Sequence, residues 1–426
     1  MLIVETDREK DLFLQYWNKE ESIIIPIWED LERHPMNNSL SFLYVRFRDD
    51  ETDDGDKKIE FIIPFNHNDC EKISIDLTQS TQYKWVWDKK GFYQCNLDIQ
   101  NVHDIHEHLF FKTNQLYDFN SKLEGLTNFY YRLGIRDDLG KSLPIMKWGE
   151  VLSKVVDEWN LTQTNSWMDE TMIPILSVVE RSGLRVDTQK FFDRWPFAHK
   201  HLKGDVVFTE YNTYTTTSRP SNRHGGINFS ALNKKDGSRE VFIPREGNIF
   251  LQMDYDAYHV RLIGKMIKFS LPDTSVHQWL ADQYGMDYND SKGRTFRILY
   301  GGVSDEDKKI PFFQKVDEFI QKIGNESRER GFVSTLNRKI PISHIENPNP
   351  QKIFNYLLQA TETELNIEVM NKLHKEGLPL PILYTYDSFL FEVNSDDIEK
   401  VKGIKSVLES FGFPIKASWG MDYSKV

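Results

Sequence analysis

The stretch at residues 248–303 reads NIFLQMDYDAYHVRLIGKMIKFSLPDTSVHQWLADQYGMDYNDSKGRTFRILYGGV, and it decides how the rest of the chain is interpreted. Its apolar start, IFL, leads to the carboxylate of Asp254, which predicts a buried strand with an acidic end. Near its end, Lys292, Phe296 and Tyr300 recur at i, i+4 and i+8, so a helix would place them on one face. On such a face the cation of Lys292 could bind a phosphate tail and the ring of Phe296 could pack against a base or sugar. The phenol of Tyr300 could contact a step of the template.

A second carboxylate lies far along the chain, in the segment 381–393, PILYTYDSFLFEV. This segment predicts two short strands with Asp387 at the turn between them. Alone, either aspartate would be read as an ordinary cap of a strand end. Two carboxylates from separate strands that converge on one sheet edge form a minimal site for hard cations, which prefer oxygen ligands. Such a pair of ions is what nucleotidyl transfer requires.

These residues resemble the three signature motifs of family A DNA polymerases. The strand ending in Asp254 is similar to motif A, and the Lys292, Phe296 and Tyr300 face is similar to motif B on the fingers helix. Asp387 and Ser388 stand where motif C usually has Asp-Glu. The three motifs occur in the family's order, which makes the resemblance far more specific than any one motif alone.

The resemblance implies roles for individual residues at the reaction centre. Asp254, Asp387 and the backbone carbonyl of Tyr255 would hold two Mg²⁺ ions, which Mn²⁺ can replace, and Lys292 would act beside the two aspartates as a catalytic cation. The nucleotide site that it implies comprises His259, His277, Lys292, Phe296 and Tyr300.

His259 departs from the family pattern at an informative place. The position five residues after Asp254 is normally a glutamate that excludes the ribose 2′-hydroxyl. Histidine is bulky enough to block that hydroxyl, but it can also donate a hydrogen bond to it. The sequence therefore leaves two alternatives open, a DNA polymerase and a relaxed-sugar or primase-like polymerase that accepts ribonucleotides.

Contacts to primer-template DNA are implied at five further positions. Arg219 lies in TTTSRPS, which resembles a family segment that reaches the minor groove at the primer end, and Tyr386 precedes the motif C aspartate. Asn355 and Gln359 are spaced i, i+4 on a predicted helix of 352–377, which suits sequence-independent minor-groove contacts. Arg239, in the basic loop after Asn228, suits a phosphate contact.

The N-terminal third resembles a proofreading exonuclease domain more loosely. Residues 22–65 predict three strands, similar to the opening β-meander of that domain. Asp30 and Glu32 have the Asp-x-Glu spacing that an exonuclease needs, but they follow the first strand by a few residues. Alignment on the apolar core instead places Pro26 and Trp28 at the acidic positions. We therefore interpret this part as a degenerate exonuclease fold that serves as a scaffold.

Histidines gather in the segment VHDIHEHLF at 102–110. On a single helix, His103 and His106 would share a face while His108 would point elsewhere. This arrangement predicts solvated surface histidines and no metal site.

The predicted fold class is α+β, an RNase H-like exonuclease-type domain followed by a polymerase palm with short fingers. The expected parts are an exonuclease-like domain, a first palm segment, the fingers and a second palm segment with motif C, at 1–168, 169–264, 265–349 and 350–426. Only about thirty residues separate Asp187 from Arg219, where the family has a long helical thumb. This shortage predicts weak processivity and a partner protein that replaces the thumb.

Composition sets the cellular context that we expect. No run of about 18 apolar residues occurs, so a membrane span is not expected. The start of the chain lacks a signal-peptide pattern, and Cys70 and Cys95 have no metal-ligand spacing, which together indicate a reducing cytoplasm, the host's if a phage encodes the protein. A net charge of −12 excludes a generally basic surface but allows a local basic groove for nucleic acid.

The function that these patterns favour is template-directed DNA synthesis from dNTPs on a primer-template, by a compact, phage-type enzyme. A non-catalytic DNA-binding scaffold of a replisome is the alternative from another class, and Ser388 and the missing thumb favour it. Retention of Asp254, Asp387 and Lys292 weighs against a scaffold, which need not keep them.

Overall fold

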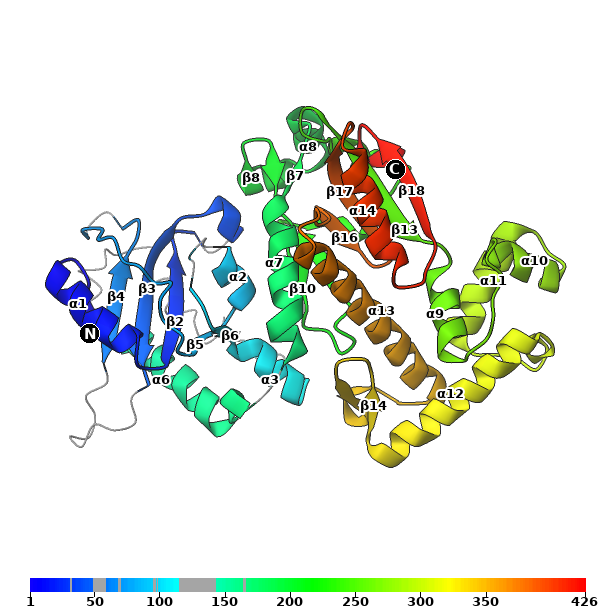
Figure 1. The fold of residues 1–426 in the computed structure, drawn as a ribbon, viewed down its shortest axis with the longest axis horizontal. Coiled ribbons are helices and arrows are strands. Elements are labelled where there is room, and N and C mark those ends of the chain that lie inside the picture. Colours follow the sequence, from blue (N-terminus) through cyan, green and yellow to red (C-terminus); the bar gives the residue numbers. More distant parts are fainter. Residues whose placement is uncertain are drawn as a thin grey trace. The chain divides into compact units, whose positions relative to one another are not determined.

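The protein is described by a computed structural model that covers residues 1–30, 33–48, 59–67, 70–94, 97, 99–114, 143–163 and 166–426, with the side chains of 143–148 and 163 left aside. The chain forms two compact units. The first comprises Met1–Arg181 and Phe197–Gly204, and the second comprises Ser182–Pro196 and Asp205–Val426. Figure 1 shows both units.

The first unit is built on a six-stranded mixed sheet in the order β1-β4-β3-β2-β5-β6. Its strands are β1 (Leu2–Ile3), β2 (Ser22–Trp28), β3 (Leu40–Phe47), β4 (Glu60–Pro64), β5 (Lys84–Val86) and β6 (Val102–Asp104). The middle three strands form the predicted antiparallel meander, and β5 and β6 extend it in parallel. The helices of this unit are α1 (Asp7–Trp17), α2 (Lys89–Tyr93), α3 (Ile105–Thr113), α6 (Leu143–Glu158) and α7 (Ile173–Ser182).

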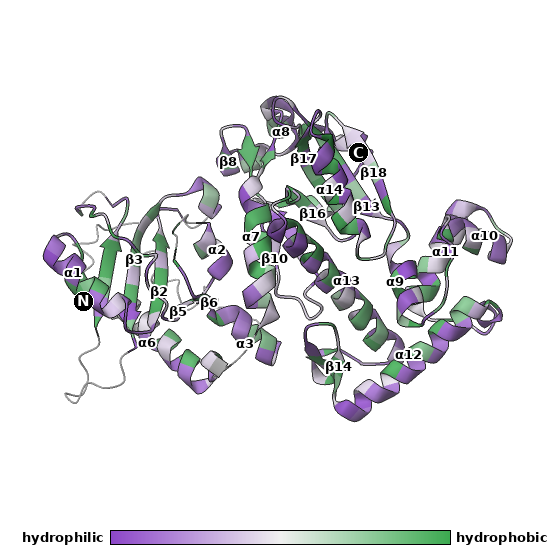
Figure 2. Ribbon diagram, viewed as in Figure 1, coloured by the Kyte–Doolittle hydropathy of each residue, from purple (hydrophilic) through white to green (hydrophobic). Residues whose placement is uncertain are grey.

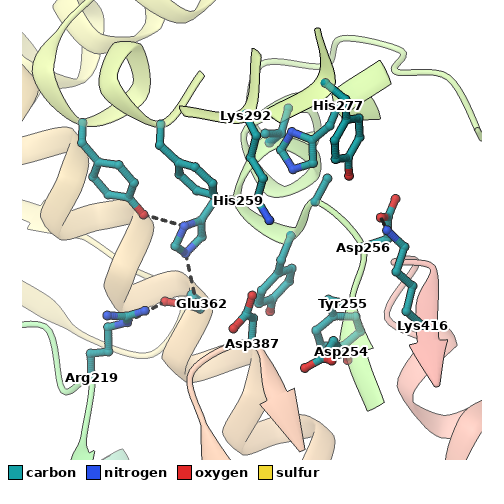
Figure 3. A pocket seen from close by; sticks show the side chains of 16 residues that line it. Arg219, Asp254, Tyr255, Asp256, His259, His277, Lys292, Glu362, Asp387 and Lys416 are labelled. Atoms are coloured by element: carbon teal, nitrogen blue, oxygen red, sulfur yellow. Dashed lines mark hydrogen bonds and ion pairs between the residues drawn. The ribbon is translucent and has the colours of Figure 1, made fainter. Parts of the chain in front are cut away.

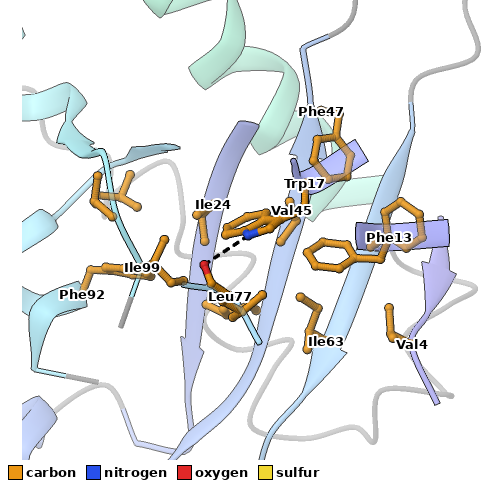
Figure 4. Packing of buried hydrophobic residues seen from close by; sticks show 14 of the residues in the cluster. Val4, Phe13, Trp17, Ile24, Val45, Phe47, Ile63, Leu77, Phe92 and Ile99 are labelled. Carbon is orange, nitrogen blue, oxygen red and sulfur yellow. Dashed lines mark hydrogen bonds between the residues drawn. The ribbon is translucent and has the colours of Figure 1, made fainter. Parts of the chain in front are cut away.

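Both faces of this sheet are covered by apolar side chains. On one face, Phe13 and Trp17 of α1 pack against Val45 and Phe61, and the indole of Trp17 donates to the carbonyl of Leu77 at 3.2 Å (Figure 4). Alternation along the strands sends the neighbouring residues to the other face, where a second cluster packs with α3 and α6. Burial on both faces explains why these strands read as nearly continuous apolar runs.

The second unit contains a sheet of four antiparallel strands, the palm-like sheet, in the order β16-β17-β13-β18. The strands of this unit are β7 (Leu184–Arg185), β9 (Val206–Val207), β10 (Tyr211–Asn212), β11 (Ser221–His224), β12 (Ile227–Asn228), β13 (Asn248–Tyr255), β14 (Phe332–Ser334), β15 (Lys339–Pro341), β16 (Leu383–Thr385), β17 (Ser388–Asn394) and β18 (Ile415–Gly420). Its helices are α8 (Thr188–Arg194), α9 (Tyr258–Met266), α10 (Val276–Tyr284), α11 (Tyr288–Gly301), α12 (Pro311–Arg330), α13 (Pro350–Lys375) and α14 (Ile398–Glu409). Figure 2 shows hydrophobic residues concentrated on β13 and β17.

Several predicted elements are confirmed. The helix face of Lys292 lies on α11, the long helix predicted at 352–377 is α13, and the two strands around Asp387 are β16 and β17. α7, which ends just before Gly183, is entered through a π-helical turn at Met168–Met172. Gly183 has φ +62°, and a Cβ there would lie 2.5 Å from Val206, so a glycine ends this helix for two reasons.

The region between Asp187 and Arg219 contains α8, of seven residues, and short strands and turns. All of its residues are described, and none belongs to a long helix. Separately, within the part of the chain that the structure describes, we find no helix with the length and apolar character needed to cross a membrane.

Candidate active site

A cavity of about 410 Å³ opens in the second unit at the end of the palm-like sheet, a volume in the range of small-molecule sites. Sixteen residues line it, drawn together in Figure 3. They are Arg219, Asp254, Tyr255, Asp256, Ala257, Tyr258, His259, Val260, His277, Tyr288, Lys292, Phe296, Tyr300, Glu362, Asp387 and Lys416.

The two predicted metal-binding aspartates meet at this cavity. β13 and β17 pair so that Asp254 stands opposite Ser388, the neighbour of Asp387. Asp387 is exposed in the cavity, and desolvation by the surrounding walls, followed by the charges of Glu362 and Asp254, raises its pKa. Among the described residues neither Asp254 nor Asp387 forms an ion pair, so this negative charge is not balanced by the protein's own cations. A divalent cation would relieve the repulsion, and the oxygen donors fit one.

Asp256, two residues after Asp254, does form ion pairs with cations of the protein. It is buried, its Oδ2 lies 3.2 Å from Arg261, and its other oxygen pairs with Lys416 of β18. Burial raises its pKa, but the hydrogen bonds and charges of Lys416 and Arg261 outweigh burial, and the net pKa is lowered. Asp256 is therefore a neutralised carboxylate that positions Lys416 at the cavity.

The helices α10 and α11 bring the predicted nucleotide-binding groups. Lys292 and Phe296 are exposed on the cavity side of α11, and the rings of Phe296 and Tyr300 stack with centroids 6.3 Å apart. His277 of α10 lies against Phe296 and is buried, and its Nδ1 has no hydrogen-bond partner among the described residues. Burial, followed by the charge of Lys292, lowers the pKa of His277, so its imidazole is neutral at pH 7.

His259 and Tyr300 are joined to a buried carboxylate that the sequence analysis did not single out. The hydroxyl of Tyr300 lies 2.5 Å from Nδ1 of His259, and Nε2 of His259 lies 3.1 Å from Oε1 of Glu362. The other oxygen of Glu362 accepts from Nε of Arg219 at 2.9 Å (Figure 3). The guanidinium of Arg219 also stacks on the ring of Tyr386, with 3.6 Å to the ring centroid.

Sequence reasoning missed two cavity-lining residues, Glu362 and Lys416, and only Glu362 could have been found from the sequence. Glu362 follows Asn355 by seven positions on α13, so it continues the helix face of Asn355 and Gln359, and a buried acid on that face was a detectable sign. Lys416 belongs to no motif. It reaches the cavity because β18 pairs with β13 and places Lys416 opposite Asp254, which only the tertiary structure shows.

The remaining predicted DNA contacts lie outside the cavity lining. Asn355 donates to the carbonyl of Tyr300 at 3.1 Å and so supports the end of α11. Gln359 is half-buried on the same helix. Arg239 donates to the carbonyl of Leu232 at 3.0 Å and stacks on Tyr423. Tyr386 adopts φ +60° at the turn before Asp387.

In the first unit, Pro26 and Trp28 lie on β2. Asp30 lies beyond the end of β2 and pairs with Arg33 at 3.2 Å, and Glu32 lies outside the described residues. Asp104 is buried, and its two oxygens accept from the backbone N–H groups of Lys89 and Glu107.

The prediction of solvated histidines was wrong for His103, His106 and His108. His106 and His108 are buried, and His103 is partly buried. The error arose from treating all three as helical: His103 lies on β6, before α3 begins, so it and His108 both approach Asp169, at 2.9 and 3.3 Å.

These two histidines and Asp169 have the donor types of a metal site. The other oxygen of Asp169 pairs with the ammonium of Lys89 at 3.2 Å, and Lys89 is itself buried. The carboxylate therefore already has a cation from the protein, and we read the cluster as a hub that ties β6, α3 and the turn before α7 together.

No known family profile and no curated protein sequence matches this chain. Among solved structures, the chain is similar to the POL domain of Pol1 from M. smegmatis, determined in complex with DNA primer-template and dNTP. The TM-score is 0.70 at 12% sequence identity, and the match covers 100% of this chain and 99% of that one. This chain therefore has the fold of a DNA polymerase's polymerase domain, which confirms the predicted α+β class.

Proposed function

We propose that this protein is a DNA-directed DNA polymerase that extends a primer by template-directed nucleotidyl transfer. The observation that carries the proposal is the meeting of Asp254 and Asp387, free of ion pairs with described residues, in a cavity that also presents Lys292 and His277. The fold likeness supports it, because the similar structure binds primer-template DNA and dNTP.

In this proposal, Asp254, Asp387 and the backbone carbonyl of Tyr255 would hold two Mg²⁺ ions, which Mn²⁺ can replace. When bound, such ions activate the attacking hydroxyl and neutralise charge on the departing pyrophosphate. All three donors are oxygen atoms, as these hard cations prefer.

The protein's own groups then bind and orient the substrates. The ammonium of Lys292 pairs with the triphosphate, and His277, neutral at pH 7, donates a hydrogen bond to it. Phe296 and Tyr300 form the flat wall against which the base and the templating step pack. We assign the palm to the sheet around β13 and β17, and the fingers to α10, α11 and α12.

For the primer-template, we propose that Arg219 and Tyr386 contact its end beside the cavity, where they stack on each other. Arg239, Asn355 and Gln359 would contribute further along the duplex, the first to phosphate and the other two in the minor groove.

We also propose that the enzyme dissociates from DNA after short extensions. The stretch between Asp187 and Arg219 contains a seven-residue α-helix and a six-residue 3-10 helix, both too short to grip a duplex behind the site. A partner protein would supply that grip in the cell. The brevity of this stretch supports placing the enzyme among compact, phage-type replication polymerases, acting in the host cytoplasm.

The first unit, in this view, is a scaffold without proofreading activity. Pro26 and Trp28 replace the acids that two-metal hydrolysis needs on β2, and both oxygens of Asp104 already accept backbone hydrogens. Exonuclease assays on single-stranded DNA with Mg²⁺ should show no degradation, and steady 3′ degradation would contradict this part.

Primer extension tests the proposal directly. The protein, a primed DNA template, Mg²⁺ and dNTPs should give short, distributive products. Asp387→Asn should reduce the rate by roughly 10²–10³-fold, since losing a metal ligand costs several kcal/mol. Asp396→Asn, which alters an exposed aspartate beyond β17, is the matched control and should retain wild-type extension. Absence of extension by the wild-type protein bound to primer-template would overturn the proposal.

A further inference from the structure

Glu362 is a fully buried carboxylate in the wall of the cavity, with 1% of the residue exposed. It lies on α13, 103 residues along the chain from His259, and it belongs to none of the three sequence motifs. Burial of a charge is costly unless partners compensate it. The partners of Glu362 are therefore the first indication of what it does.

Each oxygen of this carboxylate has its own partner. Oε2 accepts from Nε of Arg219 at 2.9 Å, and Oε1 lies 3.1 Å from Nε2 of His259. Nε2 and Oε1 face each other, and neither atom has another polar partner among the described residues. Burial raises the pKa of Glu362, but His259 and Arg219 outweigh it, and the net pKa is lowered. The carboxylate is thus ionised.

The second ring nitrogen of His259 is occupied as well. Nδ1 lies 2.5 Å from the hydroxyl of Tyr300. With Nε2 carrying the proton that faces the carboxylate, Nδ1 is the acceptor and Tyr300 donates to it. Both nitrogens of the imidazole are therefore engaged, and the ring offers only carbon-bound hydrogens to a substrate.

We propose that Glu362 is a positioning residue for sugar selection, which holds His259 as an apolar wall that excludes a nucleotide with a 2′-hydroxyl. The inference rests on the proposed function and concerns the substrate of the same site. A 2′-hydroxyl at this wall would meet a ring without a free donor or acceptor, and a buried hydroxyl without a partner is unfavourable. The sequence left open whether the enzyme uses deoxynucleotides or ribonucleotides, and this arrangement favours deoxynucleotides.

Because each oxygen of Glu362 has its own partner, the variant Glu362→Gln tests the role of this carboxylate directly. Glutamine keeps the size of the side chain but has one acceptor oxygen, so it cannot serve both Arg219 and His259. Retention of the properly aligned bond to Arg219 would turn the amide nitrogen towards His259, and Nε2 would lose its acceptor. The imidazole is then free to tilt or to offer a nitrogen to a hydroxyl.

α13 offers a matched control two residues further on. Glu364 is also fully buried, and it accepts from the hydroxyl of Thr335 at 2.6 Å and from the backbone of Asn337 at 2.8 Å. It does not line the cavity. Glu364→Gln removes the same charge from the same helix without touching His259.

The experiment measures kcat/KM for one dNTP and the matching rNTP opposite a defined template base. Wild type and Glu364→Gln should prefer the dNTP, and Glu362→Gln should lower that preference by about tenfold or more, mainly through better use of the rNTP. Equal loss of both substrates with an unchanged ratio would show that Glu362 is only structural, and would overturn the inference. Tyr300→Phe, which frees Nδ1 without disturbing the buried pair, should lower the ratio in the same direction, and this variant decides the matter if Glu362→Gln does not fold.

Failure of the proposed function is distinguishable from failure of this inference. A wild-type protein that incorporates neither nucleotide overturns both. A wild-type protein that extends primers with equal use of both sugars overturns the inference alone and identifies a relaxed-sugar polymerase.

Discussion

Tyr255 donates its backbone N–H to the carbonyl oxygen of Asp387 at 3.2 Å. This bond joins the end of β13 to the turn before β17, and the ladder between the two strands continues it through Asp254 and Ser388. A slip of one residue in this ladder would turn every side chain of one strand to the other face. The convergence of the two aspartates thus depends on the register of a buried sheet.

Asn366 of α13 supports the turn that carries Asp387. Its amide donates to the carbonyl of Tyr386 at 2.6 Å and to the hydroxyl of Tyr384 at 3.2 Å, while its oxygen accepts from Tyr258 at 3.0 Å. Asn366→Leu keeps the volume but leaves these buried groups unsatisfied, at a cost of about 1–3 kcal/mol. We expect lower stability in urea, followed by circular dichroism, and slower primer extension because the turn is looser.

Asn371→Leu is the control for this change. Asn371 lies five residues further along α13, is partly buried, and donates a hydrogen bond to Glu368 at 3.5 Å. It should behave as wild type in both assays. Wild-type extension by Asn366→Leu would show that the turn holds Asp387 without this amide.

Lys292 is exposed in the cavity and is the cation that we assign to the triphosphate. Lys292→Ala removes a charge-assisted contact worth about 1.5–3 kcal/mol, so kcat/KM for the dNTP should fall by roughly 10–150-fold. Single-nucleotide incorporation kinetics measure this. Lys322→Ala, at an exposed lysine of α12, should leave kcat/KM unchanged. A fall of less than threefold for Lys292→Ala would place the triphosphate elsewhere.

Asp169 gives the first unit an acid-dependent stability. Burial raises the pKa of Asp169, but His103, His108 and Lys89 outweigh it, and the net pKa lies far below the ordinary value. A carboxyl with a depressed pKa stabilises the fold fully above its unfolded pKa of about 3.9, and this contribution is lost as the pH falls through the folded pKa. At pH 7, Asp169→Asn should cost about 3–5 kcal/mol because it leaves Lys89 buried without its anion.

The difference between wild type and Asp169→Asn should therefore shrink as the pH falls below about 4. Urea unfolding at a series of pH values measures it. Asp7→Asn, at a carboxylate that is 84% exposed, should change stability little at any pH. A difference that stays constant from pH 7 to pH 3 would show that the ionised form of Asp169 is not what stabilises the hub.

Lys84 should make the stability of the first unit depend on pH in the alkaline range. Its side chain is buried beside Trp17, and burial, only partly offset by Glu21, lowers its pKa to about 7. Between pH 7 and the unfolded pKa of about 10.4, the unfolded chain binds the proton more tightly than the folded one, so stability rises with pH. Lys84→Met should remove this rise and stabilise the first unit near pH 7.

Hydrogen exchange of peptides from β5 in the two proteins, each compared at pH 7 and pH 9, measures this effect locally. The exposed Lys72 provides the control variant, Lys72→Met. In this variant the change in hydrogen exchange of the β5 peptides between pH 7 and pH 9 should equal that of wild type. An unchanged pH dependence in Lys84→Met would show that Lys84 stays charged in the folded protein.

Local sequence patterns were sufficient for the main elements and for most of the site. The period of 3.6 residues places Lys292, Phe296 and Tyr300 on one face of α11, and alternation with turn residues defines β16 and β17 around Asp387. Such patterns are local consequences of backbone geometry, so they can be read without the fold. The prediction for the histidine segment was wrong because a local pattern assumes one kind of element, whereas the chain changes there from strand to helix at Ile105.

Only the tertiary structure brought Glu362 and Lys416 into the site. Lys416 stands opposite Asp254 because β18 pairs with β13, and Glu362 reaches His259 because α13 packs behind the cavity. Lys416 has no spacing in the sequence that points to the site, and the seven-residue spacing of Glu362 from Asn355 indicates a shared helix face but not the contact with His259. The sequence by itself determined the elements and the two aspartates, whereas packing between elements decided which charges balance one another and which remain available to a substrate.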